Sequence, residues 1–156
     1  MKRLAVGHHN VEFIAADLAR TPLQEALAGS AYRPESGSLF ILEGLLMYLG
    51  EAEVAALFVA LSRLQRAPGR VVFTVMEPAP GGRFAFHNAT PLVNRLLALW
   101  SEPFRSALPR DGLPAFLAPF GLELRSLAAA EDLRRRYLAT PLALTQGELI
   151  VDAARP

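Results

Sequence analysis

Short apolar runs alternate with helix-forming segments along this chain, and each of the first three runs ends in an acidic residue. The runs cover residues 11–17, 38–43 and 70–77. The continuous apolar run at 38–43 is typical of a parallel strand that is buried on both faces. The alternation of strands and helices predicts an α/β fold, in which helices lie on both faces of a mostly parallel sheet.

Helices are expected between and after these strands. Thr21 as N-cap, Pro22 at the first helical position and Gln24 three residues after Thr21 predict a helix that ends near Gly29. Apolar residues at steps of three and four predict a second helix over residues 51–64. The later part of the chain is expected to form helices at 90–100, 111–117 and 129–138 and strands at 122–127 and 147–154. One of these late strands is expected to run antiparallel.

The composition describes a folded protein and excludes several kinds of site. The chain has 156 residues, 52% of them apolar and 20% charged, which fits a single domain over residues 1–156. A net charge of +1 gives no support to nucleic-acid binding. Because the chain has no cysteine, disulfides and thiolate metal sites are excluded, and the adjacent His8 and His9 lack metal-ligand spacing. We therefore expect no metal.

Two further features of the sequence concern its location. No apolar stretch reaches the roughly 20 residues of a membrane helix. The first residues, Met1 to Leu4, carry charge but are followed by Gly7 and the two histidines, so the apolar part of a secretory signal is absent. We expect a soluble, cytoplasmic protein with no membrane partner.

The acidic residues at the strand ends are the first candidates for a binding site. In open α/β sheets, ligands bind beyond the carboxyl ends of the strands, where Asp17, Glu43 and Glu77 are expected to lie. A carboxylate there suits a ligand that carries hydroxyl groups or an ammonium group. The alternative is that each acid caps the next helix or faces solvent.

The segment from Glu43 to Leu49 carries the most information. Its carboxylate follows an apolar strand, and Gly44 lets the backbone approach a ligand closely. Tyr48 could bring its ring and hydroxyl over the same pocket. The alternative is that Gly44 only makes a turn and that Tyr48 only packs.

Residues 43–49, Glu-Gly-Leu-Leu-Met-Tyr-Leu, resemble the motif that follows strand four in the leucine carboxyl methyltransferase family, including its bacterial O-methyltransferase-like members. Ala16-Asp17-Leu18 resembles that family's Asp-Leu pair after strand three. Three later segments resemble the family's second half, namely residues 101–105, 117–122 and 132–137. The resemblance implies a Rossmann-like methyltransferase fold with S-adenosylmethionine as cofactor and a small-molecule methyl acceptor.

The family also implies roles for individual residues. Asp17 and Leu18 would lie by the adenine of the cofactor, and Glu43 would lie by its methionine part. Gly44 and Tyr48 complete the predicted cofactor site, Tyr48 as a wall of the pocket. The resemblance assigns no catalytic residue and implies methyl transfer to an oxygen, either a carboxylate or a hydroxyl.

The chain departs from the family's pattern at its start. The family begins with a Gly-rich loop after strand one and an acid after strand two that grips the ribose, and neither is present. We therefore expect the carboxy-terminal part of the family's fold, with its first two strands missing. The strand at 11–17 then has no expected partner, and the strand at 39–43 presents an open apolar edge.

Three hypotheses follow from this departure. The chain is part of a methyltransferase, or it is a degenerate, non-catalytic module that associates through its open sheet edge, or it is a truncated reading of a longer gene. For the chain alone, we expect weak or absent binding of S-adenosylhomocysteine.

Overall fold

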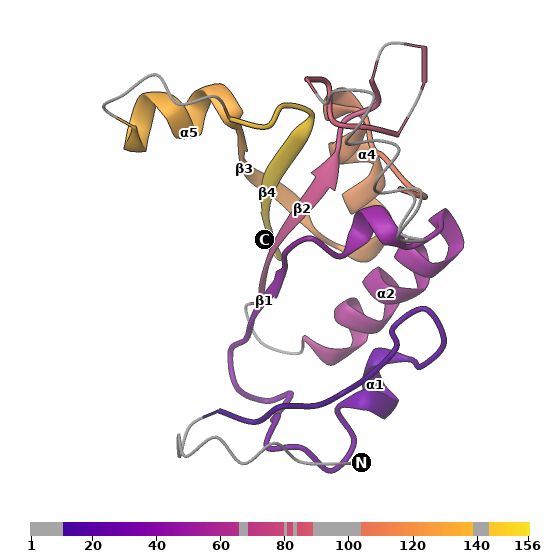
Figure 1. Cartoon of the computed structure of the whole chain (residues 1–156). Coiled ribbons are helices and arrows are strands. Elements are labelled where there is room, and N and C mark those ends of the chain that lie inside the picture. The colour runs from indigo at the N-terminus through magenta and orange to yellow at the C-terminus, as the bar shows by residue number, and fades with distance from the viewer. Residues whose placement is uncertain (1–10, 66–68, 80, 83, 89–103, 139–143) are drawn as a thin grey trace.

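The fold is built on a four-stranded sheet, as the computed structural model in Figure 1 shows. The structure describes residues 11–65, 69–79, 81–82, 84–88, 104–138 and 144–156. Its strands are β1 (Leu39–Leu42), β2 (Arg70–Met76), β3 (Glu123–Ala129) and β4 (Glu148–Ala154). Its α-helices are α1 (Leu23–Ala26), α2 (Glu51–Leu64), α4 (Leu113–Leu117) and α5 (Ala130–Tyr137). Single 3-10 turns cover Leu46–Tyr48, Arg110–Gly112 and Ala118–Phe120.

The order of the strands in the sheet is β1-β2-β4-β3. β1 and β2 are parallel, whereas β4 is antiparallel to both β2 and β3. It follows that β1, β2 and β3 share one direction and that β4 alone runs the other way. This arrangement confirms the expected α/β sheet, mostly parallel with one late antiparallel strand.

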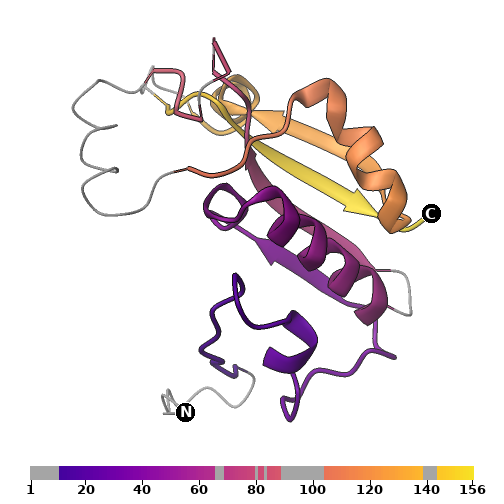
Figure 2. The same cartoon turned by 90° about the vertical axis from the view of Figure 1, so that its right-hand side faces the viewer.

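One face of the sheet carries the core. The register pairs Leu42 with Phe73 and Phe73 with Val151, so these three side chains point to the same face. α2 and α4 cover that face, as Figures 1 and 2 show from two sides. Phe58 of α2 is fully buried there. The apolar spacing predicted for residues 51–64 therefore forms the expected helix and faces the sheet.

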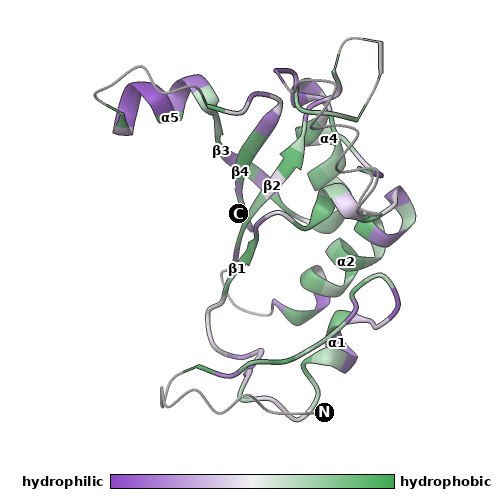
Figure 3. Cartoon of the chain, viewed as in Figure 1, coloured by the Kyte–Doolittle hydropathy of each residue, from purple (hydrophilic) through white to green (hydrophobic). Residues whose placement is uncertain are grey.

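The other face and the free edge of β1 are more open. Leu39 and Ile41 alternate with the core residues of β1 and are 57% and 64% exposed. Figure 3 shows the apolar colour of β1 continuing into β2, and α5 lying on the opposite side of the sheet from α2 and α4. Because β1 ends the strand order, the expected open apolar edge is present in the described part of the chain.

The prediction of a strand at residues 11–17 is wrong, because no strand forms there. A strand needs a neighbour to pair its backbone N–H and C=O groups, and β1 pairs only with β2 among the described strands. The apolar run therefore lacks the partner that its sequence favours, and Val11 and Phe13 are exposed.

The start of α1 also differs from the prediction. The N-cap is Pro22, not Thr21, and no side chain caps the helix. The N–H of Thr21 donates to the carbonyl oxygen of Asp17 at 2.7 Å, so Thr21 belongs to the preceding turn. The helix ends at Ala26, three residues before the expected Gly29.

The remaining elements follow the sequence closely. β2, β4 and α5 form near the predicted ranges, and β3 extends to Ala129. α4 begins at Leu113, two residues later than the predicted range, and its N-cap is Gly112. The helix predicted at 90–100 lies outside the described residues. None of the helices in the described part of the chain has the length and apolar character that a membrane span requires.

Candidate functional site

Asp17 holds its own turn together. Its Oδ1 accepts a hydrogen bond from the N–H of Ala19 at 3.1 Å, and its Oδ2 lies 3.6 Å from Nε of Arg20. A short acidic side chain that binds the backbone two residues on is a common turn device. Asp17 is also exposed and does not cap α1, so its placement matches the alternative interpretation in which this acid faces solvent.

Glu77, at the end of β2, is paired in a different way. Its Oε1 lies 3.6 Å from Nε of Arg110, just before α4. Its backbone N–H donates to the carbonyl oxygen of Gly147 at 2.7 Å, which continues the pairing of β2 with the chain entering β4. Unlike Glu43, this acid therefore already has an ion-pair partner among the described residues.

Glu43 differs from the other two acids. It follows β1 directly, is exposed, and makes no hydrogen bond or ion pair with another described residue. Gly44 beside it has a φ of 61°, a conformation that glycine adopts without steric cost. Its N–H donates to Oγ1 of Thr74 on β2 at 2.9 Å. The carboxylate therefore projects from a turn that is fixed to the neighbouring strand.

The loop after Gly44 is held from a distant part of the chain. Oγ of Ser106 donates to the carbonyl oxygen of Leu46 at 2.7 Å, and the N–H of Arg105 donates to the carbonyl oxygen of Met47 at 2.7 Å. The guanidinium of Arg105 also donates to Oε2 of Glu53 at 2.9 Å, near the start of α2. These contacts fix the path from β1 to α2.

Tyr48 packs against other rings. Its ring centroid lies 5.8 Å from that of Phe104, which in turn lies 5.2 Å from that of Phe86. Tyr48 is half-buried. The described contacts of Tyr48 match a packing role, and its role as a pocket wall stays a prediction.

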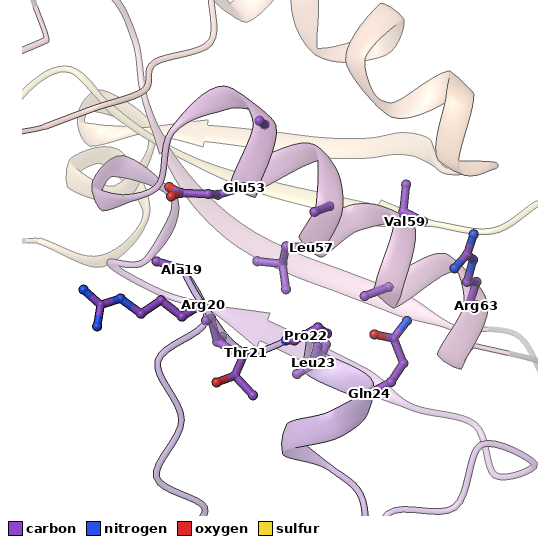
Figure 4. Close-up of a pocket in the computed structure, with 14 residues that line it drawn as sticks. Ala19, Arg20, Thr21, Pro22, Leu23, Gln24, Glu53, Leu57, Val59 and Arg63 are labelled. Atoms are coloured by element: carbon purple, nitrogen blue, oxygen red, sulfur yellow. The ribbon is translucent and has the colours of Figure 1, made fainter.

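A hollow of about 490 Å³ lies between the chain around α1 and the outer side of α2. Leu18 and Arg20 line it on one side, and Glu53 and Leu57 line it on the other. Figure 4 shows Ala19 and Arg20 near Glu53 at one end of the hollow, and Gln24 near Arg63 at the other. Its size is within the range of small-molecule sites.

The structure thus brings the predicted residues only partly together. Leu18 lines the hollow, whereas Asp17, Glu43, Gly44 and Tyr48 are not among its lining residues. The turn at 18–20 does lie by the start of α2, which follows β1 in the chain. No group of three or more His, Asp or Glu side chains in the described ranges is placed to hold a metal ion.

Sequence reasoning missed three residues that shape this site. Thr74 is the one polar residue in the apolar run from Val71 to Met76, and this interruption of the run is the sequence feature that could have indicated its role. Arg105 lies in one of the segments that resemble the family, at 101–105, but its role and that of Ser106 could not be predicted, because their partners lie more than fifty residues away in the chain.

The amino-terminal part of the chain matches a known family. Residues 2–62 match the model of the leucine carboxyl methyltransferase family. The matched part contains both the Asp17-Leu18 pair and the motif at 43–49, so the resemblance to this family is confirmed there. The later segments that resemble the family lie beyond the matched residues.

A solved structure of a methyltransferase shares the fold. A 1,6-didemethyltoxoflavin-N1-methyltransferase from Burkholderia thailandensis, solved with 1,6-didemethyltoxoflavin and S-adenosylhomocysteine, has a TM-score of 0.57 and 12% identity. The match covers 92% of this chain and 50% of that one. The leucine carboxyl methyltransferase match and this likeness together show a Rossmann-like methyltransferase fold. The chain spans half the length of that protein.

Two other solved structures match this chain with TM-scores below 0.5. The magnesium protoporphyrin IX methyltransferase of Synechocystis PCC 6803, with bound S-adenosylhomocysteine, has a TM-score of 0.45 and 13% identity over 86% of this chain and 57% of that one. The pyocyanin biosynthetic protein PhzM has a TM-score of 0.49 and 14% identity over 90% and 34%. No curated protein sequence matches the chain.

Proposed function

We propose that this chain is part of an S-adenosylmethionine-dependent methyltransferase that acts on an oxygen of a small molecule. The family match over residues 2–62 and the shared fold support this proposal. In the transfer, the acceptor oxygen attacks the methyl carbon in line, and the carbon–sulfur bond breaks with its electron pair going to sulfur. The product is S-adenosylhomocysteine. A carboxylate acceptor needs no base, whereas a hydroxyl acceptor loses its proton.

The observation that carries the proposal is that Glu43 is exposed and has no partner among the described residues. It is the one acid of the three that is exposed and makes no hydrogen bond or ion pair within the described residues. It stands at the carboxyl end of a parallel strand, where α/β folds bind ligands. We place the ammonium group of the cofactor's methionine part by this carboxylate, and the adenine by Asp17 and Leu18. Protein groups here would align the two reactants and exclude water.

We predict that Glu43→Gln weakens the binding of S-adenosylhomocysteine to the chain by about fivefold to tenfold, the value of one ordinary hydrogen bond of about 1 kcal/mol. The measurement is a titration followed through the backbone amide signals of the labelled chain, which detects binding at millimolar strength. The binding of 5′-methylthioadenosine, which lacks the amino-acid part, should be the same in both proteins.

The control for this titration is Glu35→Gln, which changes another exposed acid, in the loop before β1. It should bind both ligands as the unmodified chain does. If S-adenosylhomocysteine shifts other amide signals but leaves those of Leu18 and Gly44 unmoved, or if Glu43→Gln weakens both ligands alike, the assignment of the methionine part to Glu43 is wrong.

A second candidate function is that of a non-catalytic module that associates through the edge of β1. The observation that favours it is the open, uncharged strand with Leu39 and Ile41 exposed.

We predict that Ile41→Lys removes any concentration-dependent association seen by sedimentation equilibrium, because a lysine on an edge strand opposes pairing. Val59→Lys, on the exposed side of α2, is the control and should leave association unchanged. A monomer at all concentrations would contradict this function.

A further inference from the structure

We propose that Thr74 is a positioning residue, which sets the direction of the Glu43 carboxylate through the turn at Gly44. This inference rests on the proposed function, because it assigns a purpose to the carboxylate that Thr74 orients. Its evidence is the geometry at the end of β1, where the parallel pairing of β1 with β2 stops.

Thr74 stands where the pairing ends. The last paired residues of the two strands are Leu42 and Phe73, so the next position on β2 is Thr74 and the next on β1 is Glu43. At this point the backbone of β1 turns away from the sheet. The N–H of Gly44 is bonded by the side chain of Thr74 and not by the backbone of β2. Thr74 therefore replaces the backbone ladder with one directed hydrogen bond.

The hydroxyl of Thr74 is buried among apolar residues, and this favours its hydrogen bond with Gly44. Thr74 is 8% exposed and lies in a run whose other members, Val71 to Met76, are apolar. A buried hydroxyl without a hydrogen bond is costly, so its pairing with Gly44 is strongly favoured. Gly44, in contrast, is exposed and its N–H could turn to water. Loss of the hydroxyl would thus release the turn without unfolding the strand.

The other end of the loop is fixed independently. Ser106 and Arg105 bind the carbonyl oxygens of Leu46 and Met47, two and three residues after Gly44. These contacts hold the path toward α2 but do not touch Glu43 or Gly44. Ser106→Ala is therefore a matched control: it removes another buried hydroxyl that holds this loop, at Leu46 and not at Gly44.

The first test needs no ligand. In Thr74→Val, which keeps the shape of the side chain and removes the hydroxyl, the Gly44 amide should exchange its hydrogen with solvent about tenfold faster, as the loss of one hydrogen bond predicts. Thr74→Ser should restore the protection, and Ser106→Ala should leave the Gly44 amide unchanged. If the valine variant does not fold, Thr74→Ala serves in its place. Equal exchange in the valine and serine variants would overturn the inference.

The second test uses S-adenosylhomocysteine and 5′-methylthioadenosine as probes. Thr74→Val should weaken only the first ligand, by about threefold to tenfold, the loss expected when one ordinary hydrogen bond is misdirected, and Thr74→Ser should recover it. A valine variant that binds both ligands as the unmodified chain does, while Glu43→Gln weakens the first, would refute the positioning role alone. If Glu43→Gln has no effect while Gly44 exchange still depends on Thr74, the proposed function fails and the structural part of the inference stands.

Discussion

Phe58→Ala is expected to lower the free energy of unfolding by about 3–5 kcal/mol, the range for removing a buried aromatic ring. Phe58 is fully buried and contacts three other rings. Its centroid lies 5.2 Å from that of Phe73 on β2, 4.9 Å from that of Phe116 on α4 and 5.4 Å from that of Phe120. Because this one side chain joins α2, the sheet and α4, its loss leaves a cavity that no single element can fill.

Urea unfolding followed by circular dichroism measures this effect. Val59→Ala is the control, since Val59 is the next residue of the same helix and is 37% exposed. It should change the free energy of unfolding by less than about 0.5 kcal/mol, as is usual for surface positions. A loss below about 1.5 kcal/mol for Phe58→Ala, relative to the range for core aromatics, would show that α2 does not pack on the sheet as described.

Asp152→Asn is expected to lower the free energy of unfolding by about 1–3 kcal/mol at neutral pH, the value of hydrogen bonds to a charged group. Asp152 lies on β4, is 9% exposed, and accepts a hydrogen bond from Nε of Arg70 at 2.7 Å on its Oδ1. The terminal Nη2 of Arg70 donates to Oδ2. This fork-shaped pair crosses from β2 to β4 at the end of the sheet away from the candidate site.

The same pair makes stability depend on pH. The hydrogen bond from Arg70 is the main cause that lowers the pKa of Asp152, against the opposing effect of burial. A carboxyl group whose pKa is lower in the folded state stabilises the protein above its unfolded pKa, which is about 3.9. This contribution is lost as the pH falls from there through the folded-state pKa. The difference between the unmodified chain and Asp152→Asn should therefore be constant near neutral pH and shrink below about pH 4.

Asp132 also has a lowered pKa, chiefly because its carboxylate accepts the N–H of Ala129, so acid sensitivity alone does not isolate Asp152. A double-mutant cycle with Arg70→Gln does so. If the two changes add without coupling, the Arg70–Asp152 pair contributes nothing to stability. If the difference in the free energy of unfolding between the unmodified chain and Asp152→Asn stays the same from neutral pH to below about pH 4, the charge of Asp152 contributes nothing to stability.

The elements that could be predicted from sequence are those whose signal is local. α2 follows from apolar spacing within its own fourteen residues, and β2 follows from a continuous apolar run, because burial imposes these periods on any chain that forms them. The motif at 43–49 and the pair at Asp17-Leu18 can be recognised from sequence because each is a contiguous run of residues. Which of the acids is already paired could not be predicted, since their partners come from other turns and strands.

An α/β fold, an apolar core and three candidate acids at the ends of three apolar runs can be predicted from the order of the residues alone. Three other features appear only once the chain is folded: residues 11–17 form no strand, Glu77 pairs with Arg110, and Thr74 fixes the turn beside Glu43. The physical reason is that a strand, an ion pair and a side-chain hydrogen bond each need a second group. That group is supplied by the way the chain folds back on itself and not by neighbouring residues.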